Sequence, residues 1–528
     1  MGHAGVIPAG VVYGRDGSIV AAEHAGTAAP SGFADVPVVD TGGTIFPGLI
    51  ELHNHLPYDV LGLWQVPRRY GDRGQWSDSG QNPDYHRLIT GPMQAIGSDP
   101  ALVAAIVRYV EVRALLGGTT TSQGVTLANS KVSVTHFRGL VRNVEHTEDP
   151  DLPAAATHIA DVVARDAALF KQRISGPQKV ILHLAEGVDD AAVRAFQALH
   201  LADGSWAITS NLVGIHCVAL ADADFAAFAE NGGSMVWSPL SNLLLYGQTA
   251  NIGAALRHGV LTALGSDWAP SGSKNLLGEL KAARLARGAA QAPGLTDRDL
   301  VEMSTLTPAV MLGWAAALGS IEKTKRADLI VVAGTAGDPY TNLVEATEAD
   351  LTLVMINGVP RAATPQLMSA FGISTGLEQI SVGGQQRVLN LAQASADPQV
   401  QQITVADAIT RLRDALAALP GTPTTLAAVT ARADLEPGTV RLAVEGLVDN
   451  GQTPRPHLPV RGQLTGPNLP PTRTLAAAHA AIATGAPLPA LTLDPLTAID
   501  NPGFYDTLST ETNLTEDIRT GLAHYRRP

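Results

Sequence analysis

The sequence lacks several features that would define other classes of protein. Only one of its 528 residues is a cysteine, Cys217, so no disulfide can form within the chain. No uninterrupted apolar run approaches the ~20 residues of a membrane-spanning helix. The net charge is −13 and no basic cluster is present, which disfavours nucleic acid and anionic membranes as partners. The first residues lack the charged start and apolar core of a signal peptide. We therefore expect a cytoplasmic protein.

Histidine and aspartate residues stand at the ends of strand-like apolar segments. His53 and His55 follow Gly48-Leu-Ile-Glu-Leu, and residues two apart on a strand point to the same face, so both imidazoles can reach one ion. His183, His216 and Asp267 close three further apolar segments far downstream. In a barrel of parallel strands the catalytic residues lie where strands end. The pattern therefore predicts a catalytic metal site, and with it a hydrolase.

A His-x-His pair on its own is weak evidence, because a surface or turn pair would look the same. The prediction depends on the recurrence of polar residues at the other strand ends. Imidazole suits zinc and iron, and a catalytic site keeps one position open for water.

At this point the sequence resembles the amidohydrolase superfamily, and within it the cytosine-deaminase and triazine-hydrolase branch. The resemblance covers roughly residues 10 to 360, and such a spaced set of motifs is far more specific than any single one. The matching motifs are Phe46-Pro-Gly-Leu-Ile-Glu-Leu-His-Asn-His55, Leu115-Leu-Gly-Gly-Thr-Thr-Thr121, His183-Leu-Ala-Glu186, His216-Cys-Val-Ala-Leu220, Trp237-Ser-Pro-Leu-Ser-Asn242 and Leu264-Gly-Ser-Asp267.

The resemblance implies that the protein binds one divalent metal ion. Zinc is expected first, with iron(II) or manganese as alternatives. The implied ligands are His53, His55, His183 and Asp267. His216 would be a fifth ligand or a hydrogen-bond donor to the substrate. Metal-bound water has a pKa of ~7, so hydroxide is available near neutral pH.

The resemblance also implies the catalytic roles. Asp267 is suited to take the proton from the metal-bound water, since its carboxylate can touch both. Glu186 would carry protons between the substrate and the leaving nitrogen, and His216 would steady the tetrahedral intermediate. Each has a structural alternative: Glu186 could be an exposed loop acid or a first-turn helix acid, His216 a core histidine, and Asp267 a cap for the segment after it.

One metal ion is expected rather than two. Members with two ions bridge them through a carbamylated lysine on an inner strand between the first histidine pair and His183. The chain has only Lys131, Lys171 and Lys179 in that interval. Lys171 lies in a helix-like stretch and Lys179 begins a strand well before its end, so Lys131 is the only plausible bridge.

The fold class expected is α/β, a (β/α)8 TIM-like barrel with a composite N-/C-terminal β-sandwich domain and a Pro-rich C-terminal extension. The length exceeds the ~250 residues of a single barrel. We expect a first part of the sandwich in residues 1–46, the barrel in 47–320, the second part of the sandwich in 321–362, and the extension, of unknown role, in 363–528. One departure from the family is Lys323-Thr-Lys-Arg326, where a glycine is common in the turn.

Several local elements can be predicted as well. Apolar residues at helical spacing predict helices over Pro100 to Leu116 and Asp222 to Glu230, and a third, amphipathic one over Val405 to Leu419. Between Thr121 and Lys179 only two weak strands can be placed, Lys131–Thr135 and Leu140–Val144. Later stretches such as residues 451–459 and 467–472 are Pro-rich and favour extended arms.

The segment from Leu56 to Ser98 is the least typical part of the barrel. It concentrates aromatic residues in a chain that is only 5% aromatic, and three of its arginines stand beside them. These residues are Tyr58, Trp64, Tyr70, Trp76, Tyr85, Arg68, Arg69 and Arg73. The cluster suggests a lid or pocket wall for a polar substrate. The alternative is a surface loop packed on its own aromatics. We name Trp64, Asn242 and Trp268 as candidate substrate-binding residues.

The predicted function is metal-dependent hydrolysis of a non-peptide C–N bond by a metal-bound hydroxide. The expected reaction is deamination of an amino-substituted heterocycle, a small-molecule substrate, by a homo-oligomer. One alternative keeps the metal and changes the reaction to ring opening of a cyclic amide or to displacement of chloride. Another, from a different class, is a non-catalytic scaffold or binding protein.

Cys217 neighbours His216 on a strand, so it should face away from the barrel axis and serve packing.

Overall fold

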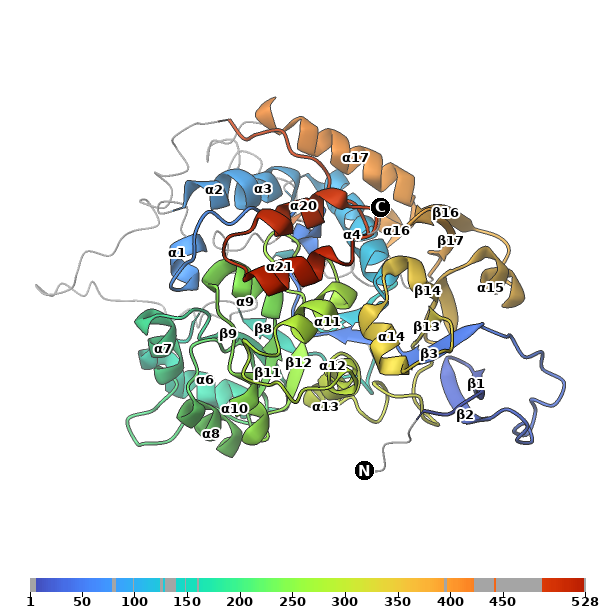
Figure 1. Cartoon of the computed structure of the whole chain (residues 1–528), viewed down its shortest axis with the longest axis horizontal. Coiled ribbons are helices and arrows are strands. Elements are labelled where there is room, and N and C mark those ends of the chain that lie inside the picture. The colour runs from blue at the N-terminus through green and yellow to red at the C-terminus, as the bar shows by residue number, and fades with distance from the viewer. Residues whose placement is uncertain are drawn as a thin grey trace, which may run out of the picture.

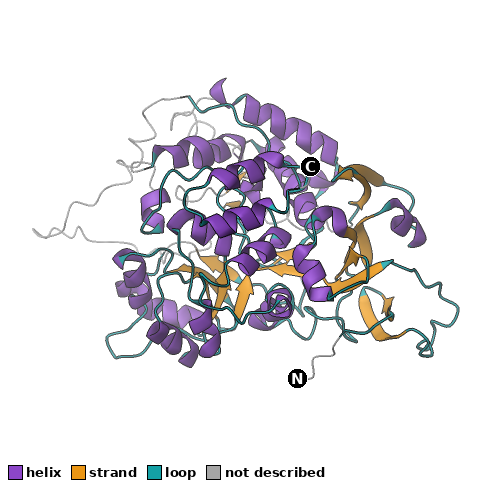
Figure 2. Ribbon diagram, in the orientation of Figure 1, coloured by secondary structure: helices purple, strands orange, loops and turns teal. Residues whose placement is uncertain are grey.

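Parallel strands form the centre of the computed structural model (Figures 1 and 2). The structure describes residues 6–77, 82–97, 99–123, 127–128, 139–147, 149–158, 161–393, 397–421, 441–442 and 487–526. One parallel sheet has the strand order β12-β11-β10-β9-β8 and a second has the order β4-β5-β7. These strands are β4 Leu49–Glu51, β5 Thr119–Ser122, β7 Arg142–Asn143, β8 Ala156–His158, β9 Val180–Leu184, β10 Leu212–His216, β11 Ser234–Trp237 and β12 Thr262–Leu264.

The apolar runs that predicted these strands are buried along their whole length. Every residue of β9 and β10 is buried, and the two strands pair in parallel so that Ile215 lies opposite His183. Strands buried on both faces read as continuous apolar runs rather than as an alternating pattern. The register places the last residues of neighbouring strands at one edge of the sheet.

Helices lie between and outside the parallel strands (Figure 2). The predicted helices over Pro100–Leu116 and Asp222–Glu230 are confirmed as α4 and α8. Asp99 caps α4 by accepting a hydrogen bond from the Ala101 amide, and Pro100 occupies the first turn, where its missing N–H costs nothing. The others in this region are α6 Ala167–Ile174, α7 Asp190–Gln197, α9 Pro239–Tyr246, α10 Ile252–Arg257, α11 Leu276–Leu285, α12 Asp297–Glu302 and α13 Leu306–Leu312.

An antiparallel sheet joins the N-terminal flank to the segment after the parallel strands. Its order is β16-β17-β15-β14-β13-β3, and β3 pairs with β13 so that Phe46 lies opposite Ile330. The strands are β3 Gly43–Pro47, β13 Leu329–Ala333, β14 Leu351–Ile356, β15 Val359–Ala363, β16 Leu377–Val382 and β17 Gln385–Asn390. Helices α14 Pro339–Glu345 and α15 Pro365–Ala370 are in the same region.

A separate hairpin, β1 Gly10–Arg15 and β2 Ser18–His24, attaches to the segment before β13. The Ile19 amide donates to the Lys325 carbonyl over 2.7 Å. Thr324, in the turn where a glycine was expected, adopts φ 76°, a left-handed conformation that is unusual for a β-branched residue. The hydrogen bond from the Thr324 amide to the Ile19 carbonyl, 2.8 Å long, holds this turn against the hairpin.

Some elements differ from the sequence-based expectation. The expected strand over Leu140–Val144 is only two residues long, β7, and Lys131–Thr135 lies outside the described residues. The hairpin of β16 and β17 was not predicted, although the Gly383-Gly384 pair between its strands is a turn signal and both glycines have positive φ. It extends the antiparallel sheet beyond residue 362, where the family resemblance ends.

The C-terminal part packs on helices that flank the parallel strands (Figure 1). The predicted helix from Val405 is α17, and it ends at Ala417 rather than at Leu419. It packs on α4, and Arg108 of α4 donates to the Ile403 and Val400 carbonyls over 3.0 and 2.9 Å. Helix α21 contacts α11. The remaining elements are α16 Pro398–Gln401, α20 Pro502–Thr510, α21 Glu516–Ala523 and the pair β6 Leu127–Ala128 with β18 Arg441–Leu442. Both Pro-rich stretches lie outside the described residues.

Among the helices described here, none has both the length and the apolar character that crossing a bilayer requires.

Candidate metal centre

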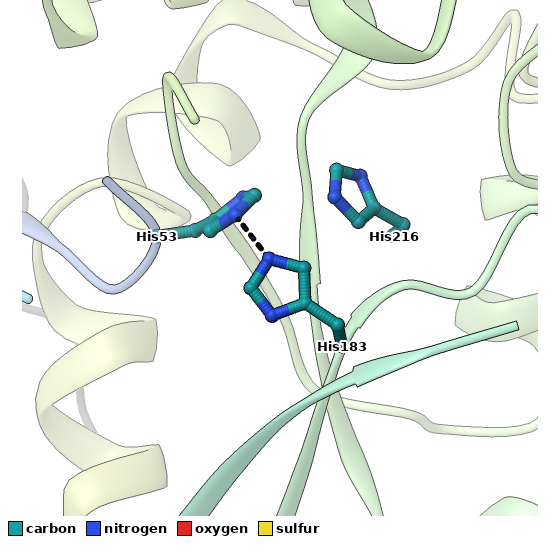
Figure 3. A group of neighbouring side chains, drawn as sticks. All are labelled: His53, His183 and His216. Atoms are coloured by element: carbon teal, nitrogen blue, oxygen red, sulfur yellow. Dashed lines mark hydrogen bonds between the residues drawn. The ribbon is translucent and has the colours of Figure 1, made fainter. Parts of the chain in front are cut away.

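The side chains predicted at the strand ends converge. His53 Nε2 lies 3.2 Å from His183 Nε2 and 3.2 Å from Asp267 Oδ1, and His55 Nε2 lies 3.5 Å from the same oxygen. The His216 ring is centred 4.8 Å from that of His53. Figure 3 shows His53, His183 and His216 with their rings turned toward a common point. All five side chains are buried.

Two of these side chains are positioned by strained backbone conformations. His216 has φ 68° and Asp267 has φ 69°, and Cys217 follows with φ 51°. Left-handed conformations of non-glycine residues cost free energy and persist where the surrounding structure enforces them, often at functional sites. Here the Asp267 amide donates to the His53 carbonyl over 3.0 Å, and the Asp267 carbonyl accepts from the His55 amide over 2.6 Å. The turn after β12 is thereby fixed against the residues after β4.

Hydrogen bonds to the outer ring nitrogens leave the inner nitrogens available as ligands. His216 Nδ1 donates to Asn242 Oδ1 over 2.8 Å, since an amide oxygen can only accept. His53 Nδ1 lies 2.7 Å from Ser238 Oγ and can donate to it. Burial lowers the pKa of His53 well below its usual value, and positive charge on the neighbouring histidines would lower it further. Neutral imidazole is the form that binds metals.

The Asp267 carboxylate is held in the same way. Its Oδ2 accepts a hydrogen bond of 2.6 Å from Ser241 Oγ, while its Oδ1 faces His53 and His55. Ser238, Ser241 and Asn242 all come from the start of α9 or the residue before it. One short motif thus orients three of the predicted site residues, as outer hydrogen bonds do in metalloproteins.

The donor atoms are close enough to share one cation. His53, His183 and His216 form one group whose ligand atoms lie within 4.8 Å of one another, and His53, His55 and Asp267 form a second. Neutral imidazole nitrogens and a carboxylate suit zinc, iron(II) and manganese. Because His53 belongs to both groups, the arrangement fits one ion better than two.

Neither described lysine between the histidine pair and His183 can bridge a second ion. Lys171 Nζ donates to Ser205 Oγ over 2.9 Å, and Lys179 Nζ donates to the Ser210 carbonyl over 2.6 Å. Lys179 is thus engaged at the start of β9, away from the strand end that carries His183, and Lys171 is engaged on α6. Lys131 lies outside the described residues.

Glu186 lies beside the histidines, at 6% exposure, and is therefore not an exposed loop acid. It is not a first-turn helix acid either, since α7 begins at Asp190 with Asp189 as its cap. Its Oε1 accepts a hydrogen bond of 2.7 Å from Tyr246 Oη and lies 3.7 Å from His216 Nε2. Glu186 can therefore exchange protons with groups near the histidines.

The segment from Leu56 to Ser98 is built into the protein rather than lying loosely on its surface. Its described elements are a 3-10 turn Leu56–Val60, α1 Arg73–Ser77, α2 Pro83–Tyr85, a π-helical turn His86–Thr90 and α3 Gly91–Gly97. Its five aromatic side chains, named above, are all buried. The ring of Trp76 packs 5.3 Å from Tyr85 and 5.8 Å from Trp268, centre to centre. The aromatics thus pack on one another and also against the site.

The three candidate substrate-binding residues lie in different surroundings. Trp268 has its ring centre 5.6 Å from that of His55, so it lines the histidine cluster. Asn242 is hydrogen-bonded to His216. Trp64 packs on Tyr70, with ring centres 6.2 Å apart, and donates its amide to the Pro270 carbonyl. Of the three, Trp268 is best placed to meet a ligand held beside His55.

Sequence reasoning missed several residues that touch the site. They are Ser238, Ser241 and Tyr246. The two serines lie in the Trp237–Asn242 motif that supports the family resemblance, so their polar character was a usable signal. Tyr246 belongs to no motif. Arg73 and Trp76 were named, but only as members of the cluster expected to form a lid or pocket wall. Cys217 is buried, and burial raises the pKa of its thiol, which agrees with a packing role.

Parts of the chain are similar to known proteins. Residues 178–361 match the amidohydrolase family. An S-triazine hydrolase from Gordonia rubripertincta is 30% identical over 154 residues, which are 29% of this chain and 32% of that protein. A 5-methylthioadenosine/S-adenosylhomocysteine deaminase from Acetivibrio thermocellus is 31% identical over 157 residues, 28% of this chain and 36% of the relative. The matched stretch thus spans about a third of the length of these curated relatives.

A solved structure extends the comparison to most of the chain. The crystal structure of an adenosine deaminase from Xanthomonas campestris with bound zinc superposes with a TM-score of 0.50 at 20% identity, covering 78% of this chain and 94% of that one. These matches confirm the predicted relationship to amidohydrolases and a TIM-barrel-like α/β fold.

Proposed function

We propose that this protein is a metal-dependent amidohydrolase that hydrolyses a non-peptide C–N bond and removes ammonia from an amino-substituted heterocycle. The convergence of His53, His183 and Asp267, drawn from segments more than 80 residues apart, carries the proposal. Burying several imidazoles and a carboxylate together costs desolvation free energy, and such a departure from an apolar core is expected at a functional site.

Four side chains would hold the ion: His53, His55, His183 and Asp267. We propose zinc as the ion, with iron(II) and manganese as the alternatives that metal analysis distinguishes. When bound, a divalent ion in such a site acidifies water near it to a pKa of ~7. The hydrogen bonds between His53 Nδ1 and Ser238 and from Ser241 to Asp267 Oδ2 support this ligand set, since they leave the remaining ligand atoms facing inward.

The neighbouring residues divide the proton transfers and the charge stabilisation. Asp267 Oδ1 accepts the proton of the attacking water, since it lies among the inward-facing nitrogens. Glu186, in its protonated form, gives its proton to the leaving nitrogen, so that ammonia rather than an amide anion departs, and the proton taken up by Asp267 then restores it. His216 steadies the oxygen on which negative charge develops as an imidazolium, because Nδ1–H donates to Asn242 Oδ1 and a proton on Nε2 is then needed to face that oxygen. Its closeness to Glu186, 3.7 Å between Nε2 and Oε1, supports two roles within one reaction centre.

We also propose that the two parallel sheets close into one (β/α)8 barrel. At one junction Asn54, after β4, forms a parallel bridge with Asp267, after β12. At the other junction the Ala155 amide donates to the Val144 carbonyl over 3.0 Å. The pairing of β3 with β13 supports a composite β-sandwich made from both flanks, with the barrel over residues 47–320 between them.

The substrate class rests on the relatives, one named for S-triazine and the other for deamination of a purine nucleoside derivative. Both names describe nitrogen heterocycles. A buried site lined by Trp268 and supported by Trp76 suits a flat ring that can stack.

Two measurements on one preparation test the proposal. Protein purified without chelator should contain about one equivalent of zinc, iron or manganese, and should release ammonia from at least one member of a panel of purines, pyrimidines, pterins and triazines. His183→Ala should lose most of the metal and the ammonia release, while His200→Ala, an exposed histidine, should keep both. Chloride release or ring opening without ammonia would favour the alternative reactions. Metal content that stays far below one equivalent after reconstitution would favour a non-catalytic scaffold.

A further inference from the structure

Two hydrogen bonds connect Glu186 to the aromatic segment. Trp76 Nε1 donates to Tyr246 Oη over 2.8 Å, and Tyr246 Oη lies 2.7 Å from Glu186 Oε1. Trp76 belongs to α1, Tyr246 to the end of α9, and Glu186 to the loop after β9. Trp76, Tyr246 and Glu186 are 3%, 2% and 6% exposed, so water does not compete for these bonds.

The direction of both hydrogen bonds is fixed by chemistry. An indole nitrogen can only donate, so the Tyr246 oxygen accepts from Trp76, and its own proton points to Glu186. Burial, and then the negative charge of Glu186, raise the pKa of Tyr246 well above its usual value. The phenol therefore keeps its proton and remains a donor to Oε1.

The two carboxyl oxygens of Glu186 consequently differ. Oε1 accepts from Tyr246, whereas Oε2 accepts no hydrogen bond from the residues that the structure describes. Arg73 Nε lies 3.7 Å from Oε2, which is ion-pair distance rather than hydrogen-bond distance, and its guanidinium also faces Asp161 at 3.5 Å. When Glu186 is protonated, Oε1 is occupied as an acceptor, so the proton resides on Oε2.

We infer that Tyr246, oriented by Trp76, is a positioning residue that reserves Glu186 Oε1 as an acceptor and assigns the proton in transit to Oε2. The inference rests on the proposed function, in which Glu186 transfers that proton. It gives the segment from Leu56 to Ser98 a second role: through Trp76, the segment that lines the site also sets the orientation of its proton carrier.

Trp76 is suited to this role because it is itself fixed. Its ring packs against Tyr85 and Trp268, and Trp268 in turn faces His55. In addition, the Arg73 amide donates to the Glu186 carbonyl over 3.2 Å, so α1 holds the main chain of Glu186 as well as, through Tyr246, its side chain. A displacement of α1 would move the carboxyl group that the reaction uses.

The test compares Tyr246→Phe, Trp76→Phe and the double variant, each loaded with zinc. With an amino heterocycle that the wild type deaminates, Tyr246→Phe should lower kcat by at least about tenfold, while KM stays within about threefold and zinc content is unchanged. Trp76→Phe should cause a smaller loss. The double variant should be no worse than Tyr246→Phe, because Trp76 acts only through the phenol.

Two further readouts separate positioning from a general packing defect. The kcat loss should be much smaller for the chloro analogue of the same heterocycle, since departing chloride needs no proton. Tyr109→Phe, which removes another buried hydroxyl, on α4, should keep kcat within about twofold. Crystal structures of wild type and Tyr246→Phe should show the Glu186 carboxylate rotated in the variant.

An unchanged kcat for Tyr246→Phe, equal losses with both leaving groups, or a carboxylate that keeps its orientation would overturn the inference. The crystallographic comparison needs no turnover. It therefore tests the positioning role of Tyr246 even if the wild type releases no ammonia. The absence of ammonia release would count against the proposed function alone.

Discussion

Glu279 is a buried carboxylic acid next to the motif that orients the site. Its Oε1 accepts a hydrogen bond of 3.1 Å from the Leu240 amide, and Ser273 Oγ bonds to Oε2. Burial raises the pKa of Glu279 to about 8, so the folded protein holds this carboxyl protonated at neutral pH. In the unfolded chain the same group ionises near its usual pKa of 4.5. Between these two values the folded state binds more protons than the unfolded state.

The stability contribution of Glu279 should therefore be fully present below about pH 4.5 and decline as pH rises toward about 8, by up to ~1.4 kcal/mol per pH unit. Glu279→Gln imitates the protonated acid, and its stability should not decline in this way. Urea unfolding midpoints at pH 5.5 and pH 8 measure the difference. Wild type should lose stability relative to Glu279→Gln on going to pH 8, whereas the exposed Glu230→Gln should follow wild type. Parallel behaviour of all three proteins would show that Glu279 is ionised in the folded state.

The sequence predicted the residues at the centre of the site better than the residues around them. His53, His183 and Asp267 could be found because each ends an apolar segment, and strand ends meet at one edge of a parallel sheet. Tyr246 could not, because a helical tyrosine is most often ordinary core, and Trp76 of α1 could be named only as one member of an aromatic cluster. Their role depends on a contact between residues 170 positions apart, which no local pattern records.

At the scale of elements, the site depends on how closely β4 approaches β5. Gly48 precedes β4, and a Cβ placed on it would overlap Thr120 of β5. The Gly48 amide also donates to the Asp328 carbonyl over 2.8 Å, so the strand cannot simply move away. Since His53 and His55 follow this strand, its position sets the position of two proposed ligands.

Gly48→Ala should therefore lower the unfolding free energy by ~1–3 kcal/mol, the usual cost of overpacking a buried site, and weaken metal retention during dialysis. Gly288→Ala provides the matched control, since an added Cβ there meets no atom within 4 Å. Thermal unfolding and zinc content measure both effects. Equal melting temperatures for the two variants would mean that β4 and β5 can separate without cost.

Elements with a strong local pattern were predicted best. Helix α4 was placed at both ends, because Asp99 and Pro100 mark its start and Gly117 follows its last residue. Strand β7 contains only Arg142 and Asn143, so the weak pattern over Leu140–Val144 overstated its length. The hairpin of β16 and β17 carries Glu, Gln and Arg among its apolar residues, which hid its strand character although its Gly-Gly turn was visible.

At the scale of the whole molecule, the last described segment, residues 487–526, is attached to α4 and to the segment before α11 through a buried charge cluster. Asp494 Oδ2 forms ion pairs with Arg113 Nη1, over 2.7 Å, and with Lys274 Nζ. Its Oδ1 accepts from Asn501 Nδ2 over 2.8 Å. Arg113 also donates to the Asp59 carbonyl over 2.7 Å, which connects the cluster to the start of the aromatic segment.

Asp494→Asn should be strongly destabilising, because it leaves two buried cations without their carboxylate. Breaking one partner of a buried pair costs ~3–5 kcal/mol. Asp506→Asn, which removes an exposed pair with Arg526, should cost at most ~1 kcal/mol. Chemical unfolding of the two variants checks the contrast. A loss for Asp494→Asn as small as that for Asp506→Asn would show that the segment contributes little to holding the fold.

The same segment also contacts the walls of the site. Glu511 Oε1 accepts from the Val66 amide over 3.0 Å, and Asn513 Nδ2 donates to the Leu244 carbonyl of α9 over 2.6 Å. The sequence predicted only extended arms in the C-terminal extension, because composition indicates an arm but cannot specify where a single Asp494 will be buried. That placement requires cations from α4 and from the segment before α11, and both are remote in sequence.

The central claim is that one metal ion lies among His53, His55, His183 and Asp267, and anomalous diffraction at the zinc edge from crystals of the zinc-loaded protein tests it most directly. We predict one strong peak about 2.0–2.2 Å from the Nε2 atoms of the three histidines and from an Asp267 carboxylate oxygen. No peak at that position, or a peak only elsewhere on the protein, with His53 and His183 still in direct contact, would contradict it.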